Sequence, residues 1–303
     1  MSELRHDAIS GLPVILAVDR AARPFTVSAV EPDPAGTLVC PFCPGHEHET
    51  PPEVARTGTG APQTPGWRVR VVPNLYPIVP THEVVILSPD HQTSFGGLTD
   101  EQAVEVLTVL RDRSSHHLAN GNKYVQVLVN HGRAAGASIA HPHAQIIALD
   151  FVPPAPTEAI ARFDAGGGDL VARELAAARD TGLLVLDGPS PAWSPPAAAV
   201  PYSLRVAHRS TRARFDEATD AEIGVVAVAL RDAVALVDRV LLRPPYNLIV
   251  HTAPPDVRAG EFHWYVDIVP RVTVIAGFEQ GSGVFVNTVA PEAAAEALRA
   301  VTP

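Results

Sequence analysis

A stretch of ten residues, 136–145, constrains this chain more than any other, because it reads GASIAHPHAQ and runs directly into the apolar residues 146–149. Side chains of an extended strand alternate between its two faces, so His141, His143 and Gln145 are expected to share one face. Pro142 has no N–H to give to a sheet ladder and belongs on an edge strand or at the start of a strand. A His-x-His pair alone is more often a surface feature than a site. Motifs elsewhere in the sequence are therefore needed to determine whether this face forms a catalytic site.

The only two cysteines, Cys40 and Cys43, form a Cys-x-x-Cys pair. Two cysteines cannot provide a disulfide framework for 303 residues, which leaves a metal half-site or a redox pair. A redox pair usually starts a helix after a strand, whereas prolines and a glycine surround this one. As a zinc half-site, the pair needs two more nitrogen or sulfur ligands. The nearest candidates are His46 and His48, and the distant candidates are His91 and His141.

Length and charge exclude several classes of protein. A chain of 303 residues forms one large domain or two of ordinary size, and a hydrophobic content of 46% is enough for a core. It contains no apolar run of about 18 residues, and its first residues, MSELRHD, lack the order of a secretory signal. A net charge of −10 disfavours broad binding to nucleic acid. We therefore expect a cytoplasmic protein without a membrane or nucleic-acid partner, in which any nucleotide binds in a local pocket.

The pattern of apolar residues predicts both helices and strands. Residues 99–119 carry apolar side chains at helical spacing, with Thr99 as the cap and two acidic residues in the first turn. A segment rich in proline and glycine, 153–168, is expected to be a loop that joins two structural units. Four strands are expected, over 13–18, 68–78, 83–87 and 124–129.

The second half of the chain reads as a degraded copy of the first. Three segments recur at an offset of 120 or 122 residues: 95–100 at 215–220, 110–112 at 230–232, and His141 at His263. Such a self-match predicts duplication of an α+β unit. In the copy, Tyr265 stands in the place of His143, and Asp267 stands in the place of Gln145. Only the first repeat therefore keeps both imidazoles.

Six motifs occur in order along the chain. The most specific is the Gly-x-Ser-x-x-His-Pro-His-x-Gln pattern of residues 136–145. The others are Arg20-x-x-Arg23-Pro24, Cys40-x-x-Cys43, Asn74, Ser88-Pro89-Asp90-His91 and Asn130. Together they resemble the two-repeat branch of the histidine-triad superfamily, which includes galactose-1-phosphate uridylyltransferase and related nucleoside-diphosphosugar and dinucleoside-polyphosphate phosphorylases. The resemblance implies an α+β fold in which two histidine-triad-like repeats form one curved antiparallel sheet flanked by helices. By it, residues 1–165 hold a zinc site and the catalytic sequence, and residues 166–303 form a degenerate repeat that completes the substrate pocket.

The resemblance also implies a metal cofactor, Zn2+. It maps the zinc ligands onto four residues: Cys40, Cys43, His91 and His141. A metal held by His141 would fix the strand two residues before His143 and so orient that ring. The compact alternative, in which His46 and His48 complete the cysteine pair, would leave this strand unanchored. We therefore expect the set that contains both distant histidines.

The resemblance maps the nucleophile of the family onto His143. A neutral imidazole can attack the α-phosphorus of an activated nucleotide when a hydrogen bond to its other nitrogen sets the tautomer. Gln145 can donate a hydrogen bond to a phosphate oxygen but cannot carry a proton. Because the hydrolase branches of the superfamily have a third histidine at that position, we expect transfer to a phosphate acceptor rather than hydrolysis.

Substrate-binding roles map onto six more residues: Arg20 and Arg23 at the phosphates, Asn74 and Asn130 at the nucleoside or phosphate, Ser138 at the transferred group, and Glu279 near a sugar hydroxyl. Two departures from the galactose enzymes matter. Of their second metal site only His251 and Glu158 remain, so we expect that site to be absent or altered. The residues that follow Glu279 do not place a glutamine where the galactose enzymes use one to read the hexose, which leaves the sugar open.

We expect a nucleotidyltransferase that moves a UMP or AMP group between a nucleoside-diphosphosugar and a phosphate acceptor through a covalent nucleotidyl-histidine. Hexose-1-phosphate uridylyltransferase is one form of this activity. The alternative form is a phosphorylase of nucleoside-diphosphosugars or dinucleoside polyphosphates that uses inorganic phosphate. A noncatalytic nucleotide-binding zinc protein is the alternative of a different class, because fold alone does not determine function. Homodimers are usual among the relatives, so the resemblance implies a homodimer, although nothing in the composition indicates one.

Overall fold

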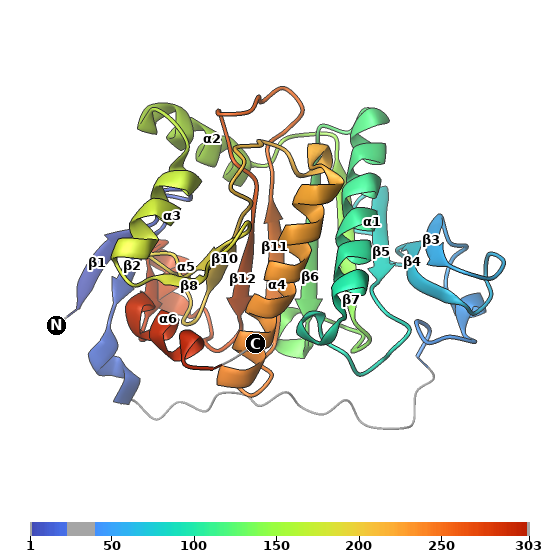
Figure 1. The fold of residues 1–303 in the computed structure, drawn as a ribbon, viewed down its shortest axis with the longest axis horizontal. Helices are drawn as coiled ribbons and strands as arrows, with labels where there is room; N and C mark the ends of the chain where they lie inside the picture. Colours follow the sequence, from blue (N-terminus) through green and yellow to red (C-terminus); the bar gives the residue numbers. More distant parts are fainter. Residues whose placement is uncertain (1, 23–39, 302–303) are drawn as a thin grey trace.

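The computed structural model describes residues 2–22 and 40–301 (Figure 1). Its centre is a sheet of ten strands, each antiparallel to its neighbours. In spatial order these are β3 (Ala55–Gly58), β4 (Trp67–Pro73), β5 (Thr81–Ile86), β7 (His143–Leu149), β6 (Tyr124–His131), β11 (Tyr246–His251), β12 (Tyr265–Pro270), β10 (Leu204–Val206), β9 (Ala192–Trp193) and β8 (Leu184–Leu186). The predicted α+β fold with one large antiparallel sheet is confirmed.

The two repeats meet in the middle of this sheet. β6 of the first repeat pairs with β11 of the second, and Asn130 lies opposite Asn247. Moving outward from this pair, the order is β7 then β5 on one side and β12 then β10 on the other. The strand of His143 therefore corresponds to the strand of Tyr265, as the repeated motifs predict. One continuous hydrogen-bonded sheet runs through the duplication.

One long helix from each repeat covers the same face of the sheet, and the two lie side by side (Figure 1). They are α1 (Asp100–Ala119) and α4 (Asp220–Val240). Each begins after a threonine whose hydroxyl accepts a backbone N–H of the first turn, Thr99 from Gln102 and Thr219 from Glu222. Threonine is favoured there because it satisfies a donor that has no partner inside the helix. The helix predicted to start after Thr99 is confirmed.

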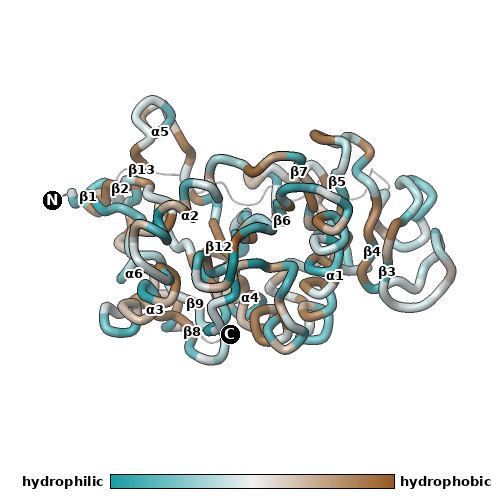
Figure 2. The backbone as a smooth tube through the Cα atoms, turned by 90° about the horizontal axis from the view of Figure 1, so that it is seen from above, coloured by the Kyte–Doolittle hydropathy of each residue, from teal (hydrophilic) through white to brown (hydrophobic). Residues whose placement is uncertain are grey.

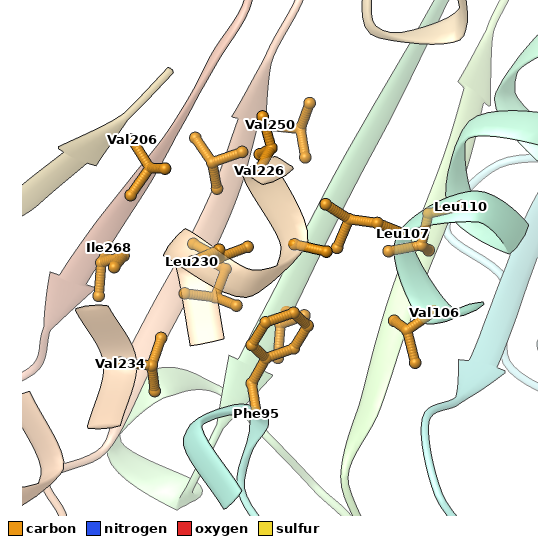
Figure 3. Close-up of a cluster of buried hydrophobic side chains, with 14 of the residues drawn as sticks. Phe95, Val106, Leu107, Leu110, Val206, Val226, Leu230, Val234, Val250 and Ile268 are labelled. Carbon is orange, nitrogen blue, oxygen red and sulfur yellow. The ribbon is translucent and has the colours of Figure 1, made fainter. Parts of the chain in front are cut away.

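The main core lies between these two helices and the sheet (Figure 3). Leu110 of α1 and Leu230 of α4 belong to the same buried cluster as Ile146 of β7. Because side chains alternate along a strand, His143 and Gln145 of β7 face away from the helices. The helices thus cover the apolar face of the sheet and leave the other face for polar side chains.

The face opposite the helices carries a row of directly opposed residues that crosses both repeats. In order across five strands, the row contains Gln145, Leu128, Ile249, Asp267 and Arg205. Directly opposed residues of antiparallel strands share a face and contact each other. Asp267, which stands in the place of Gln145, therefore lies in the same row as Gln145. Polar residues of both repeats therefore lie on this side of the sheet, with Leu128 and Ile249 between them.

Segment 153–168 is not the loop that its prolines and glycines predict. It contains α2 (Pro154–Gly166), and α3 (Leu170–Asp180) follows. Two prolines lie in the first turn of α2, where a backbone N–H has no partner within the helix and the fixed φ of proline fits. Gly167 ends the helix with a φ of +68°. The prediction was wrong because proline breaks a helix in its interior but not at its start.

A small sheet lies at one end of the molecule. It contains β1 (Glu3–His6), β2 (Pro13–Leu16) and β13 (Phe285–Asn287), with β2 antiparallel to β1 and parallel to β13. α5 (Gly277–Ser282) projects from this end, as Figure 2 shows. The remaining helices are α6 (Pro291–Arg299) and the short η1 (Val18–Ala22), η2 (Glu47–Glu49), η3 (Phe95–Gly97), η4 (Arg133–Ala135) and η5 (Phe215–Glu217). In the part of the chain that the structure describes, no helix is both long and apolar enough to cross a membrane.

Candidate active site

β7 begins at His143, directly after Pro142, and is the fourth of the ten strands. Of the two positions predicted for Pro142, the start of a strand is correct and the edge of the sheet is not. The carbonyl oxygen of Pro142 accepts the backbone N–H of Leu87 at 3.1 Å, although proline has no N–H of its own to donate. The proline therefore leads the chain into the sheet at the point where His143 emerges.

His143 is buried and held in one orientation. Its Nδ1 lies 2.8 Å from the carbonyl oxygen of His141 and must donate, because a carbonyl only accepts. The proton of the neutral ring is therefore on Nδ1, and Nε2 keeps its lone pair. Burial lowers the pKa of His143, so the ring is neutral near pH 7. Nε2 is available as a nucleophile.

Three separate segments of the chain bring four residues together close to His143: Cys40, Cys43, His91 and His141. Their possible ligand atoms all lie within 4.8 Å of one another. Nε2 of His141 donates to the carbonyl oxygen of Ser88 at 2.7 Å, so Nδ1 is the nitrogen that can bind a metal. The cluster could bind a metal ion. It is the set of residues that the resemblance implies.

The compact alternative is not assembled. Nδ1 of His46 lies 3.2 Å from Oε1 of Glu49, and the rings of His46 and His48 lie 6.3 Å apart. Within residues 2–22 and 40–301, the spacing of a metal site occurs in the group around His141. Burial and the adjacent Cys40 raise the pKa of Cys43 to about 11. A thiolate on one cysteine disfavours ionisation of the other, and a cation between them would offset this repulsion.

Gln145 is connected to Asn74 through a residue that sequence reasoning missed, His82 of β5. Nε2 of His82 lies 2.9 Å from Oε1 of Gln145, and Nδ2 of Asn74 lies 3.3 Å from Nδ1 of His82. His82 is only 5% exposed, and burial lowers its pKa. The strand predicted here begins at Glu83, whereas β5 begins at Thr81 and includes His82. The alternation of side chains along β5 places His82 on the same face as Val84 and Ile86, and the pairing of β5 with β7 brings it to Gln145.

Asn130 and Ser138 lie where the chain approaches β7. Nδ2 of Asn247, from the second repeat, donates to Oδ1 of Asn130 at 2.7 Å. Gly136 has a φ of +94°, and a Cβ there would lie 3.4 Å from Nδ2 of Asn130. Glycine is the residue that adopts this backbone conformation without strain. The loop therefore passes close to Asn130 and leaves Ser138 exposed at the entrance to the strand.

Arg20 and Glu279 lie elsewhere in the chain. Both line a cavity of about 480 Å³ beside α5 and β13, together with Phe278. His143 does not line this cavity. Arg23, which was predicted with Arg20, lies outside the described residues. Within one chain, the structure thus brings Arg20 and Glu279 to each other but not to His143.

The second repeat holds a buried ion network where the first repeat holds its imidazole and amide. Arg205 is 3% exposed, and its guanidinium lies 2.9 Å from Asp267, 2.8 Å from Glu174 and 3.6 Å from Asp7. It also lies over the ring of Tyr265, 4.5 Å from the centroid. Burial acts to raise the pKa of Asp267, but the charge of Arg205 outweighs burial and lowers that pKa. Asp267 is therefore an ionised partner of Arg205.

The two residues expected to remain from a second metal site lie on different elements, His251 at the end of β11 and Glu158 on α2. Nε2 of His251 is 3.2 Å from Oδ2 of Asp267, whereas Glu158 is exposed on α2. Nδ1 of His263, the counterpart of the metal-facing nitrogen in the first repeat, bonds to Oδ2 of Asp169 at 2.8 Å. A carboxylate thus stands beside His263 where the first repeat has its Cys/His cluster.

Comparison with known proteins gives one consistent relationship. The family described as "Galactose-1-phosphate uridyl transferase, N-terminal domain" matches residues 80–153. An ADP-glucose phosphorylase of Arabidopsis thaliana is 30% identical over an alignment of 335 positions, gaps included, that covers 99% of this chain and 93% of that protein. A galactose-1-phosphate uridylyltransferase of Thermotoga maritima is 27% identical over 238 residues, 72% of this chain and 73% of that protein. The crystal structure of an ADP-glucose phosphorylase from Arabidopsis thaliana with bound ADP-glucose matches with a TM-score of 0.88 at 27% identity, covering 100% of this chain and 99% of that chain.

Proposed function

The chain belongs to the galactose-1-phosphate uridylyltransferase-like branch of the histidine-triad superfamily, and we propose that it is a nucleotidyltransferase that moves AMP from ADP-glucose to inorganic phosphate. The observation that carries the proposal is the lone pair on Nε2 of His143, which the backbone of His141 fixes beside Gln145. The Arabidopsis ADP-glucose phosphorylase, which this chain matches over nearly its whole length, supports adenine as the base and phosphate as the acceptor. The similarity to uridylyltransferases favours a second candidate, transfer of UMP to a hexose 1-phosphate.

In the first half-reaction, Nε2 of His143 attacks the α-phosphorus of the sugar nucleotide. A P–N bond forms, the bond from this phosphorus to the bridging oxygen breaks, and the sugar 1-phosphate leaves with the electron pair. A phosphate monoester is a good leaving group near neutral pH, so no strong general acid is required. The hydrogen bond from Nδ1 to the carbonyl of His141 stabilises the positive charge that the ring acquires.

In the second half-reaction, an oxygen of inorganic phosphate attacks the same phosphorus. The P–N bond breaks, its electron pair returns to Nε2 of His143, and ADP leaves. The sum is ADP-glucose and phosphate in, ADP and glucose 1-phosphate out. Gln145 donates a hydrogen bond to a nonbridging phosphoryl oxygen in both steps. Because an amide cannot accept the proton of an attacking water, Gln145 favours transfer over hydrolysis.

We assign Zn2+ to the Cys/His cluster because its spacing fits tetrahedral zinc. Bonds of about 2.3 Å to sulfur and about 2.0 Å to nitrogen separate two nitrogen ligands by about 3.3 Å and a nitrogen from a sulfur by about 3.5 Å. The structure has 3.3 Å between the Nδ1 atoms of His91 and His141, 3.4 Å from Nδ1 of His91 to Sγ of Cys43, and 3.8 Å from Nδ1 of His141 to Sγ of Cys40. With four protein ligands, zinc would hold the backbone that orients the nucleophile. A reducing cytoplasm would keep both thiols available.

Replacement of His91 by alanine is expected to remove most of the bound zinc, because it deletes one of four ligands. Replacement of His46 by alanine is expected to leave the zinc content unchanged, since His46 pairs with Glu49 instead. Zinc per chain is measured by mass spectrometry of the metal after dialysis of both variants against metal-free buffer. Loss of zinc from the His46→Ala protein together with its retention in the His91→Ala protein would show that the compact set binds the metal.

The substrate-binding roles of Arg20 and Glu279 lead us to propose a homodimer. These residues line a cavity apart from His143, yet their roles require contact with the phosphates and the sugar. α5 projects from its end of the molecule (Figure 2), and Phe278 on it is 52% exposed. A second copy that covers α5 would bring Glu279 and Arg20 to a site that contains His143 of the other chain. Arg23 has the same proposed role as Arg20, while Asn74, Asn130 and Ser138 act within the chain.

The proposed reaction is tested by incubation with ADP-glucose or UDP-glucose, each alone, with inorganic phosphate, and with galactose 1-phosphate. Intact mass identifies any nucleotide on the protein, and chromatography identifies the products. We expect an AMP adduct with ADP-glucose alone and release of ADP when phosphate is added. A UMP adduct that only a hexose 1-phosphate discharges would establish the second candidate. No adduct and no turnover with either donor would refute nucleotidyl transfer and favour a noncatalytic nucleotide-binding zinc protein.

A further inference from the structure

We propose that His82 is a positioning residue that determines which end of the Gln145 amide faces the transferred phosphoryl group. His82 lies on β5, the strand that pairs with β7, and is almost fully buried. The inference rests on the proposed function, because it assigns His82 an effect on the reaction through Gln145. His82 itself is not placed in contact with the reacting atoms.

The hydrogen bonds of His82 determine its tautomer. The backbone N–H of Ile78 points at Nδ1 of His82 at 3.3 Å, and an N–H can only donate. Nδ1 therefore carries the lone pair, and the ring proton of the neutral imidazole is on Nε2. Burial of the ring, which disfavours its charged form, is consistent with this neutral state. His82 thus offers one donor, and that donor is directed toward β7.

A donor at Nε2 fixes the orientation of the Gln145 amide. Nε2 of His82 lies 2.9 Å from Oε1 of Gln145, which accepts, so the NH2 end of the amide points away from His82. Gln145 and His143 are two residues apart on one strand and share a face. The NH2 end is therefore the end that an anionic phosphoryl oxygen on His143 would meet. A reversed amide would present its own oxygen to that anion and repel it.

The ring of His82 is held from its other side by the turn between β4 and β5. Nδ2 of Asn74 lies 3.3 Å from Nδ1 of His82 and can donate to its lone pair, whereas its contact with the protonated Nε2 at 3.2 Å is not a hydrogen bond in this tautomer. Oδ1 of Asn74 accepts the backbone N–H of Tyr76 at 2.9 Å. The backbone N–H of Asn74 also donates to the carbonyl of His82 at 2.8 Å. These contacts restrict rotation of the ring, so its Nε2–H stays aligned with Gln145.

The test is a double-mutant cycle between His82 and Gln145, with ADP-glucose and phosphate as substrates. His82→Leu removes the donor, and we expect kcat to fall about tenfold to a hundredfold with a smaller change in KM. In a Gln145→Leu protein the same substitution is expected to cause little further loss, because the group that it positions is already gone. His82→Gln keeps an N–H donor at about the same reach and is expected to recover most of the activity.

Gln126→Leu is the matched control. Gln126 lies on the same face of the neighbouring strand β6, but its Nε2 donates to the carbonyl of Val250 at 2.9 Å, so kcat should change by less than about twofold. The inference is overturned if His82→Leu costs the same factor with and without Gln145, or if His82→Gln is as slow as His82→Leu. AMP labelling of the unmodified protein is measured in the same experiment. If that protein labels normally, such a result refutes only the role of His82, whereas an unmodified protein that takes no label refutes the proposed function as well.

Discussion

A His143→Gly protein is expected to bind the sugar nucleotide, to form no covalent adduct and to lose turnover by about three or more powers of ten. Glycine removes the attacking nitrogen but leaves the carbonyl of His141, because that group belongs to the backbone. The metal cluster also does not depend on the side chain of His143. Free imidazole should enter the vacated space beside Phe42, attack the bound nucleotide and release nucleotidyl-imidazole. Intact mass and analysis of the small-molecule products measure these outcomes.

Labelling of the His143→Gly protein would contradict this mechanism and would transfer the role to another histidine. His263 is poorly suited, since Nδ1 bonds to Asp169 and Nε2 to the carbonyl of His208, each at 2.8 Å. His131 would be the candidate to examine. Burial of the ring is the main cause that lowers the pKa of His131 to about 4, with a smaller contribution from the proximity of His143, so His131 is neutral near pH 7. A His131→Gly protein is therefore the control, and we expect it to accept label.

Replacement of Arg205 by methionine is expected to lower the free energy of unfolding by about 3–5 kcal/mol. Methionine is apolar and unbranched, so it fills much of the space but leaves the buried Glu174 and the partly buried Asp267 without their cation. Removing one partner of a buried ion pair costs more than the pair contributes, because the remaining charge has no water to solvate it. Urea unfolding of the two proteins at one pH, with the slopes compared, measures the difference.

Arg209→Met is the matched control for this stability effect. Arg209 also pairs with a carboxylate, Asp187, at 2.7 Å, but the two side chains are 45% and 51% exposed. Water solvates the remaining charge at such a site, so the expected loss is below about 1 kcal/mol. If both variants lose the same small amount, the carboxylates around Arg205 are protonated or hydrated when it is absent, and the network does not hold the second repeat together.

Features whose physical cause lies within a few residues could be predicted from the sequence. The Thr99 hydroxyl accepts a neighbouring N–H, so a threonine before an acidic first turn was sufficient to place the start of α1. Alternation along a strand was sufficient to place His143 and Gln145 on one face. The spacing of the cysteine pair left two sets of histidines open, and the resemblance to a family was needed to favour His91 and His141 over the nearer pair.

Contacts between distant segments could not be predicted from spacing. Arg205, Glu174 and Asp7 come from a strand, a helix and a turn that are far apart in the chain, and no periodicity relates them. The contact of His82 with Gln145 depends on the register of β5. Because the predicted strand begins two residues too late, His82 lies outside it and its face cannot be assigned. The error at α2 has a different cause, since the same proline is favourable at the first position of a helix and unfavourable inside it.

The parallel pairing of β2 with β13 has a consequence for how the protein is made. Val14 lies opposite Phe285, so the whole of the large sheet has to emerge from the ribosome before β2 can find its partner. Neighbouring strands such as β6 and β7 can pair much earlier, because few residues separate them. The small sheet is thus completed last, and it can open locally without breaking the ladder that carries His143. The cavity with Arg20 and Glu279 lies at this end of the molecule, whereas His143 lies on β7, which pairs with strands that are synthesised earlier.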